Sequence, residues 1–330
     1  TRVTNTWFVC VWFPNKALSW IVDKRCAVHH VSIAYSCVVV YFGSVQHIEF
    51  VHTDHFETNY YRHYVTGPLA LFIEFFWQTK FEHLWQKYPD GFSDVLFPNL
   101  GYSYLINLGT PYSMQIEQNK QQLRGDGFLP RLNNIEAFHQ PGNVVFGIKF
   151  KVSPVIFEKK VNFSEYSGTM FPLSYLMEQT VINNVKHLFT FEKRVQYLTQ
   201  HYEQIIEQYQ GSLKPISIVT SILQKAVIDN SFHTAVEELA AQHHVSTRTL
   251  QRYFETSTGL SSKQALQVLR IRKAVSHIIT RPQTFHYGVY GYYDYSHFYK
   301  HLRQFLQKDS LVHLQPHLQL LQIARKKELK

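Results

Sequence analysis

The stretch ELAAQHHVSTRTLQRYFETSTG, residues 238–259, contains two short helical patterns separated by a break. Val236, Leu239 and Ala240 stand at the i, i+3, i+4 spacing of an apolar helix face. The helical pattern fails at HHV, and Ser246 follows as a residue whose hydroxyl can accept a free backbone N–H at the start of a helix. The spacing therefore predicts a short helix, a tight break and a second helix.

The second of these helices is predicted to bury one edge. Leu250 and Phe254 are four positions apart, so they share one side of a helix and are expected to pack on the first helix. Gly259 is expected to end the second helix, because glycine accepts the left-handed backbone found at many helix ends. Two short helices joined in this way form a helix-turn-helix.

The outer face of the second helix carries side chains that suit DNA. Arginine can donate two hydrogen bonds to guanine, and glutamine can pair with adenine. Hydroxyl groups near the helix start suit phosphate oxygens. The predicted DNA-binding residues of this motif are Ser246, Thr247, Arg248, Gln251 and Arg252. The alternative is the solvated face of an ordinary helical hairpin.

A second copy of the pattern lies in TFHYGVYGYYDYSHFYKHLRQF, residues 284–305. Val289 is expected in a short first helix, and Asp294 is expected to cap the next helix. Phe298 and Leu302 repeat the buried pair that is four positions apart. The predicted DNA-binding residues of this second motif are the outward ones: Tyr295, Ser296, Tyr299, Lys300 and Arg303.

A long helix is predicted between the two motifs, over SSKQALQVLRIRKAVSHII, residues 261–279. One of its faces is apolar and consists of Val268, Ile271, Val275 and Ile278. Such a helix can hold two reading heads at a fixed separation, and heads about 34 Å apart meet successive major-groove segments on one face of a duplex. The order of motif, long helix and motif is more specific than either motif alone.

The charge of the chain is concentrated in its last third. The 330 residues have a formal net charge of +9, and residues 231–330 supply +8 of it through 14 Lys and Arg against 6 Asp and Glu. A basic third joined to a near-neutral remainder is typical of a nucleic-acid-binding module. With 45% hydrophobic and 17% charged residues, the chain is globular and long enough for two or three compact units.

The three cysteines, Cys10, Cys26 and Cys37, form neither a disulfide framework nor a metal-binding pair. This pattern favours a reducing compartment. No apolar run approaches the roughly 20 residues that span a bilayer, and WFVCVWF lacks the cleavage site of a signal peptide. A cytoplasmic location is expected.

The middle of the chain has the alternation of β-strands. Tyr104, Ile106 and Leu108 alternate with smaller or polar residues before a Gly-Thr-Pro turn, and residues 140–150 repeat this arrangement after a Pro-Gly-Asn turn. Residues 66–78 are predicted as a buried strand or a short helix. Several short strands with such turns indicate a sandwich or a barrel.

The predicted fold class is therefore α+β. A β-rich domain covers residues 58–155, a helical connector 156–212, and an all-helical domain with two helix-turn-helix motifs 213–317. A basic tail, 318–330, follows. Residues 1–57 are either a β-like extension of the first domain or a stretch upstream of the natural start.

The helical domain resembles the DNA-binding domain of the AraC family of transcription regulators. The resemblance rests on ELAAQHHVSTRTLQRYFETSTGLSSKQALQVLRIRKA, residues 238–274, and on GYYDYSHFYKHLRQF, residues 291–305. More weakly, PDGFSDVLFPNLG and FGIKF are similar to a subgroup of that family with an amino-terminal β domain. The resemblance implies sequence-specific binding of double-stranded DNA and control of transcription, often as an activator.

Further expectations come with this resemblance. The implied partners are double-stranded DNA, RNA polymerase, a second copy of the chain and a small-molecule effector on the β domain. The outward residues of both recognition helices are implied to reach bases. No enzymatic activity, cofactor or metal is expected.

The second motif departs from the family pattern. FHYGVYGYYD, residues 285–294, stands where the family usually has an Ile-Ala pair and an acidic residue. LQKDSLVHLQ, residues 306–315, lacks the usual Gly and Ser/Thr-Pro pair. The second head is therefore expected to bind weakly or to contact phosphates only. A degenerate family member that folds but does not read DNA is an alternative.

Other residues raise the alternative of metal chemistry. VHTDHFETNYYRH gathers His52, Asp54, His55, Glu57 and His63. Their spacing differs from the His-x-His pattern of a β-domain metal enzyme, so a polar edge is favoured over a metal-dependent enzyme with a DNA-binding appendage. An alkyl-repair enzyme would need clustered thiolates, which the scattered cysteines do not supply.

His297 and His301 are four positions apart on the second predicted recognition helix. They could clasp a metal ion, but a position facing phosphate or the core is favoured. Their titration near pH 6.5 would make DNA binding sensitive to pH.

Overall fold

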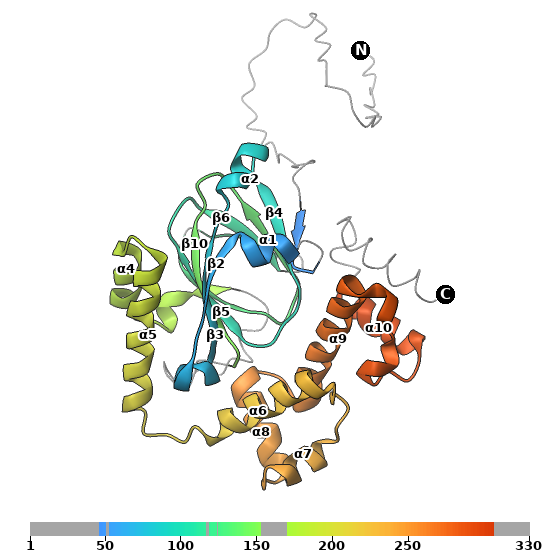
Figure 1. Ribbon diagram of the computed structural model, residues 1–330. Coiled ribbons are helices and arrows are strands. Elements are labelled where there is room, and N and C mark those ends of the chain that lie inside the picture. Colours follow the sequence, from blue (N-terminus) through green and yellow to red (C-terminus); the bar gives the residue numbers. More distant parts are fainter. Residues whose placement is uncertain (1–45, 51–52, 117–118, 124, 153–169, 307–330) are drawn as a thin grey trace, which may run out of the picture. The chain divides into compact units, whose positions relative to one another are not determined.

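The computed structural model describes residues 46–50, 53–116, 119–123, 125–152 and 170–306 (Figure 1). The amino-terminal part of this range is rich in strands, and the part from residue 179 onward is helical. The predicted α+β class is confirmed. The cysteines, the predicted basic tail and residues 1–45 of the predicted extension lie outside the described residues.

Two sheets form the β-rich domain. The first contains, in spatial order, β1 (Gln46–Ile48), β4 (Phe92–Leu96), β9 (Ile135–His139), β6 (Tyr112–Ile116) and β7 (Asn119–Leu123). The second contains β11 (Phe171–Pro172), β8 (Gly127–Pro130), β5 (Tyr102–Asn107), β10 (Val145–Phe150), β3 (Ile73–Thr79) and β2 (Tyr60–Tyr64). All pairs are antiparallel except β1 with β4.

The two sheets pack face to face as a sandwich, one of the two architectures that the sequence indicated. Leu105, Leu129 and Val145 from the six-stranded sheet share one buried cluster with residues of the other sheet, such as Met114 and Ile135. Burial of apolar side chains between the layers is the main stabilising contribution in such an architecture. Strand β1 and all but the last residue of helix α1 (Thr53–Thr58) fall within the predicted extension, and β1 pairs with β4 of the sandwich.

The segment at residues 66–78, predicted as a buried strand or a short helix, contains one of each. A 3-10 helix, η1 (Gly67–Leu71), leads directly into β3. Opposite β3, Gly147 of β10 leaves room for an indole ring, because a Cβ at this position would lie 2.1 Å from Cε2 of Trp77. The indole therefore packs directly against the backbone of β10.

One short helix, α2 (Glu82–Lys87), belongs to the sandwich. The described part of the connector contains the 3-10 turn η3 (Leu173–Tyr175), followed by two helices. They are α4 (Gln179–His187) and α5 (Phe191–Gln208). Thr190 caps α5 by accepting the N–H of Lys193. Tyr202 is fully buried and its ring meets that of Phe150 edge-on, 6.0 Å between centroids, so α5 is held against the sheet.

The helical domain has the predicted order. Its elements are α6 (Lys214–Asp229), α7 (Val236–Gln242), α8 (Thr247–Thr258), α9 (Ser262–Thr280), the 3-10 turns η4 (Pro282–Thr284) and η5 (Tyr287–Tyr290), and α10 (Tyr295–Phe305). Ser246 caps α8 and Gly259 ends it with φ of 71°. Leu250 and Phe254 are fully buried, so the predicted helix-turn-helix is confirmed.

The second motif keeps its recognition helix and shortens its first helix. Asp294 caps α10 by accepting the N–H of His297 at 2.7 Å, and Phe298 and Leu302 are buried. The preceding helix is a single 3-10 turn, η5, ended by Gly291 with φ of 74°. Val289 in that turn is 50% exposed, so it contributes little to the core. Within the described residues, no helix is long and apolar enough to cross a membrane.

Candidate nucleic-acid interface and ligand cavity

Helix α8 presents a polar and basic surface. Thr247, Arg248 and Arg252 are exposed there. Ser246 is exposed as well, but its hydroxyl accepts the N–H of Thr249 at 3.1 Å and donates to the Thr249 hydroxyl at 2.8 Å. The capping bonds give Ser246 a role in starting the helix, while the two arginines extend from its outer face.

Gln251 is placed differently from the two arginines. Its side-chain amide donates to Oε1 of Glu255 at 2.9 Å, and its Oε1 faces the hydroxyl of Ser262 at 3.2 Å. These bonds connect the middle of α8 with the start of α9. A base contact by Gln251 would therefore require an internal hydrogen bond to break.

The outward face of α10 is aromatic as well as basic. Ser296, Lys300 and Arg303 are exposed. Tyr295 and Tyr299 are half-buried, and their rings are stacked with centroids 5.7 Å apart. All ten predicted DNA-binding residues thus lie on or at the start of α8 and α10.

The two histidines of α10 contact each other, with ring centroids 4.5 Å apart. Burial, together with the nearby His297, Arg270 and Lys300, lowers the pKa of His301 to about 4. His301 is therefore neutral at physiological pH. The expectation that it titrates near pH 6.5 is wrong, because the sequence does not reveal how its ring is buried.

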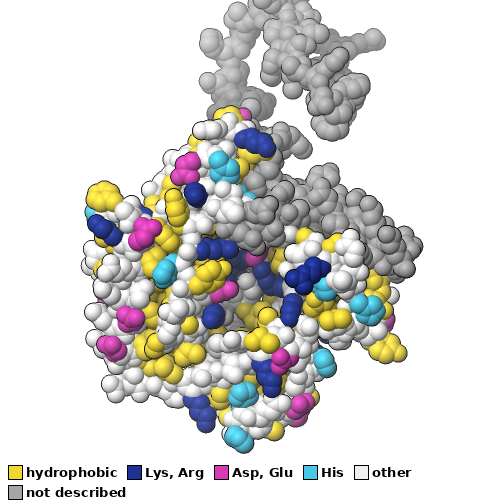
Figure 2. Space-filling view, in the orientation of Figure 1, with side chains coloured by type: hydrophobic (Ala, Val, Ile, Leu, Met, Phe, Trp, Pro, Cys, Tyr) yellow, Lys and Arg dark blue, Asp and Glu magenta, His cyan; other side chains and the backbone are white. Residues whose placement is uncertain are grey.

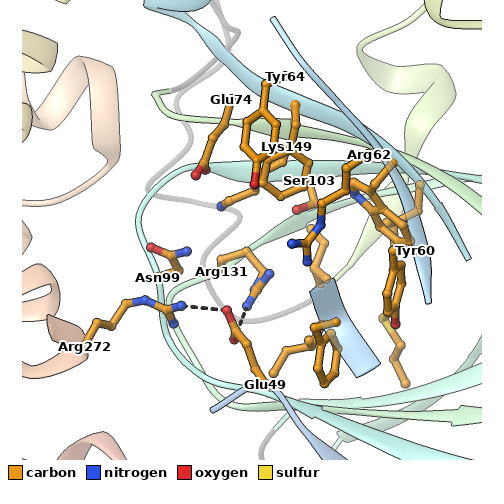
Figure 3. Close-up of a pocket in the computed structure, with 17 residues that line it drawn as sticks. Glu49, Tyr60, Arg62, Tyr64, Glu74, Asn99, Ser103, Arg131, Lys149 and Arg272 are labelled. Atoms are coloured by element: carbon orange, nitrogen blue, oxygen red, sulfur yellow. Dashed lines mark hydrogen bonds and ion pairs between the residues drawn. The ribbon is translucent and has the colours of Figure 1, made fainter. Parts of the chain in front are cut away.

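A cavity of about 290 Å³ lies between the two sheets of the sandwich (Figure 3). Its inner wall is apolar and includes Phe56, Trp77, Leu96, Leu105, Met114 and Leu129. Its charged residues come from several elements: Glu49 after β1, Arg62 on β2, Glu74 on β3, Arg131 after β8, Lys149 on β10 and Arg272 on α9. Figure 2 shows a hollow in this face of the molecule with charged side chains of both signs inside it.

Glu49 is the centre of an ion-pair network at the cavity. Its Oε1 lies 2.6 Å from Nη2 of Arg272, and its Oε2 lies 3.4 Å from Nη2 of Arg131. Burial acts to raise the pKa of Glu49, but the charges of Arg272 and Arg131 outweigh it and lower this pKa to about 2. Glu49 is therefore ionised at physiological pH.

Lys149 has a less favourable environment. Its Nζ donates to the backbone oxygen of Leu100 at 2.7 Å, and the side chain is buried. Burial and the nearby charge of Arg131 lower the pKa of Lys149 to about 7. Its ammonium group would gain from an additional anion in the cavity.

Sequence reasoning did not identify these cavity residues. A signal was present at Lys149, because a lysine interrupts the apolar run FGIKF of β10. Nothing in the sequence indicates that Glu49, Arg131 and Arg272 meet, since they are far apart along the chain.

The alternative metal cluster is not assembled in the described residues. His55 is buried among aromatic rings and stacks with Phe81 at 5.9 Å, while His63 lies on β2. His52 and the side chains of Asp54 and Glu57 lie outside the described part. The described residues contain no group of three or more His, Cys, Asp or Glu that could hold a metal ion.

Comparison with known proteins gives similarity to solved structures only. No family model matches the sequence, and no curated protein matches it. One similar structure is ToxT from Vibrio cholerae, with 11% identity, a TM-score of 0.35, and coverage of 66% of this chain and 91% of ToxT.

Two further structures show similarity of the same order. ToxT from Vibrio cholerae strain SCE256 bound to an unsaturated fatty acid has 9% identity and a TM-score of 0.38, covering 66% of this chain and 88% of that one. The AraC-like transcriptional activator CuxR has 9% identity and a TM-score of 0.26, covering 68% of this chain and 89% of CuxR. At this level of similarity, the function has to be argued from the residues of the chain itself.

Proposed function

We propose that the protein is a sequence-specific DNA-binding transcription regulator, of the kind that activates transcription through contact with RNA polymerase. The observation that carries this proposal is the pair of capped recognition helices, α8 and α10, on either side of α9. Each one buries an i, i+4 pair and directs cationic side chains outward. Phosphate neutralisation by these cations supplies affinity, and contacts to base edges supply specificity.

The two heads have different roles in this proposal. In the first head, Arg248 and Arg252 are exposed one helical turn apart, which suits hydrogen bonds to guanines. In the second head, Lys300 and Arg303 are the exposed cations. Thr247 and Ser296, near the helix starts, suit phosphate contacts.

In-vitro selection from a random duplex pool tests the proposal, with the full-length chain at physiological salt. Recovery of two boxes about one helical turn apart is the expected result. Binding that is strongly dependent on salt but enriches no sequence would instead identify a degenerate protein with non-specific affinity for DNA.

We also propose that the cavity binds a small organic anion with an apolar body, as an effector. Four basic residues line it against two carboxylates, so the lining has an excess of positive charge, which is larger when Lys149 is protonated. The apolar wall between the sheets would take the body of the ligand, and Lys149 with Arg62 would take its anionic group. We further propose that the protein acts as a homodimer.

Titration calorimetry tests the effector proposal. Straight-chain carboxylates of increasing length are compared with the matching alcohols, which have the same body and no charge. The carboxylates are expected to bind, and Lys149→Met is expected to weaken them much more than it weakens the alcohols. Equal binding of acids and alcohols would contradict an anion site.

A further inference from the structure

The second head has a reading surface unlike that of the first. Counted from their N-caps, Ser246 and Asp294, positions one and five hold Thr247 and Gln251 in α8. The same positions in α10 hold two tyrosines, Tyr295 and Tyr299. Where the first head offers hydrogen-bonding groups, the second offers flat aromatic rings.

These rings form a continuous strip on the helix surface. Tyr295 and Tyr299 are stacked at 5.7 Å with an interplanar angle of 20°. Tyr287, from the turn η5, meets the ring of Tyr295 edge-on at 6.3 Å. The strip is thus built from both elements of the second head.

The strip is supported from beneath. The ring of Tyr295 also meets that of the fully buried Phe298, 6.1 Å between centroids. Because both outer tyrosines are half-buried and packed on the core, they have little rotamer freedom left to lose on binding. The surface is therefore ordered before it meets a partner.

The major groove contains one apolar group that such a surface can recognise. Guanine, cytosine and adenine present hydrogen-bonding edges there, whereas thymine adds a C5-methyl group. An aromatic face cannot make the bidentate hydrogen bonds that arginine or glutamine makes, but it can cover a methyl group and exclude water from it.

We propose that Tyr295 and Tyr299 make the second head select thymine, by packing their rings against thymine methyl groups in the major groove. Lys300 and Arg303, exposed beside the strip, hold the head to the phosphates. This inference rests on the proposed DNA-binding function and specifies the half of the operator that the second head reads. The operator is then asymmetric: guanines in the box of the first head and thymines in the box of the second.

The rival role for the tyrosines is a phosphate contact through their hydroxyl groups. The two roles use different atoms of the tyrosine and different atoms of the DNA. Methyl recognition uses the ring and the C5-methyl, whereas phosphate contact uses the hydroxyl and is indifferent to the base. Each atom can be removed separately.

The experiment uses the full-length chain and the duplexes recovered by selection, with deoxyuridine replacing thymine in one box at a time. This change removes the methyl group alone. In the second box, each lost methyl is expected to weaken binding about fourfold, the size expected for burial of one methyl. In the first box, the same replacement serves as the control and is expected to change little.

Two protein variants complete the test. Tyr299→Phe removes only the hydroxyl and is expected to keep the preference for thymine over deoxyuridine. Tyr299→Gln introduces the residue that occupies this position in the first head and is expected to abolish the preference at the thymine that Tyr299 covers. The inference would be overturned in favour of phosphate contact if deoxyuridine in the second box left the affinity unchanged and Tyr299→Phe weakened the binding of all sequences equally.

The selection itself separates this inference from the proposed function. A first box alone, or a second box rich in guanine, overturns the inference while sequence-specific DNA binding stands. Recovery of no motif at all overturns both. Recovery of a thymine-rich second box with a methyl-dependent affinity supports both.

Discussion

Oε1 of Glu49 accepts a hydrogen bond at 2.6 Å from Nη2 of Arg272, 223 positions further along the chain. Glu49 lies beside the first strand of the sandwich, and Arg272 lies on α9, between the two helix-turn-helix motifs. Arg272 also donates to the backbone oxygens of Pro98 at 2.7 Å and Phe97 at 3.3 Å. The wall of the cavity and the helix that connects the two heads therefore share one ion-pair network (Figure 3).

We expect Glu49→Gln to weaken this connection. The substitution leaves the buried guanidinium of Arg131 and the partly buried one of Arg272 without their shared carboxylate, and breaking a buried pair in this way costs about 3 kcal/mol. Urea unfolding measures the loss, and amide hydrogen exchange shows whether α9 becomes less protected.

Glu74→Gln is the matched control for that prediction. It removes a second carboxylate from the same cavity, but Glu74 forms no ion pair with Arg272 within the described residues. Equal loss of α9 protection in both variants would mean that general cavity charge, and not the Glu49–Arg272 contact, holds the helix.

The stability of the protein is expected to fall in acid through the same residue. The pKa of Glu49 is about 2 in the folded protein against 4.5 for the free side chain. Because the folded pKa is the lower one, the contribution of Glu49 is fully present above about pH 4.5 and is lost as the pH falls toward 2. The difference in unfolding free energy between wild type and Glu49→Gln should shrink over this range. A difference that stays constant down to pH 2 would contradict the ion-pair role.

The local parts of this arrangement are predictable from sequence and the long-range parts are not. The caps Ser246 and Asp294 and the buried pair Leu250 and Phe254 follow from spacing within one or two helical turns, and the structure confirms them. Gln251 looks outward by the same spacing, yet it bonds to Ser262 of the next helix. Helical periodicity shows which face a side chain lies on, but not which neighbouring element reaches it.

The cavity illustrates the same limit more strongly. Arg131, Lys149 and Arg272 come from a loop, a strand and a helix, and only the folded chain brings them to one carboxylate. A charged residue within an apolar run, such as Lys149, indicates that a charged side chain is buried, but it does not identify the groups that this side chain contacts. Likewise, the first helix of the second head is a single turn with Gly288 inside it and Gly291 directly after it, and glycine disfavours a longer helix at both positions.

We expect binding of a carboxylate in the cavity to be coupled to proton uptake. Lys149, with a pKa of about 7, is mostly neutral at pH 8 in the free protein. A nearby anion raises the pKa of the amine, so the complex takes up a proton, and affinity falls as the pH rises above 7. Calorimetry in two buffers of different ionisation enthalpy measures the uptake at pH 8. Lys149→Met should abolish it; uptake that persists in this variant would assign the proton to another group.

On α8, truncation of the exposed Arg248 and of the internally bonded Gln251 is expected to affect different properties of the protein. Arg248→Ala removes a side chain that is exposed on α8, so DNA affinity should fall by about 1–3 kcal/mol and the preference at particular base pairs should relax. Gln251→Ala removes the bonds to Glu255 and Ser262, so it should cost about 1 kcal/mol of folding stability and leave the base preference nearly unchanged. Parallel urea unfolding and selection experiments separate the two effects.

If Gln251→Ala instead relaxes the preference at an adenine, its internal bonds must break on DNA, and Gln251 belongs with the arginines as a reader of bases. If Arg248→Ala weakens all sequences equally, the arginine contacts phosphate, and the specificity of the first head must come from Arg252.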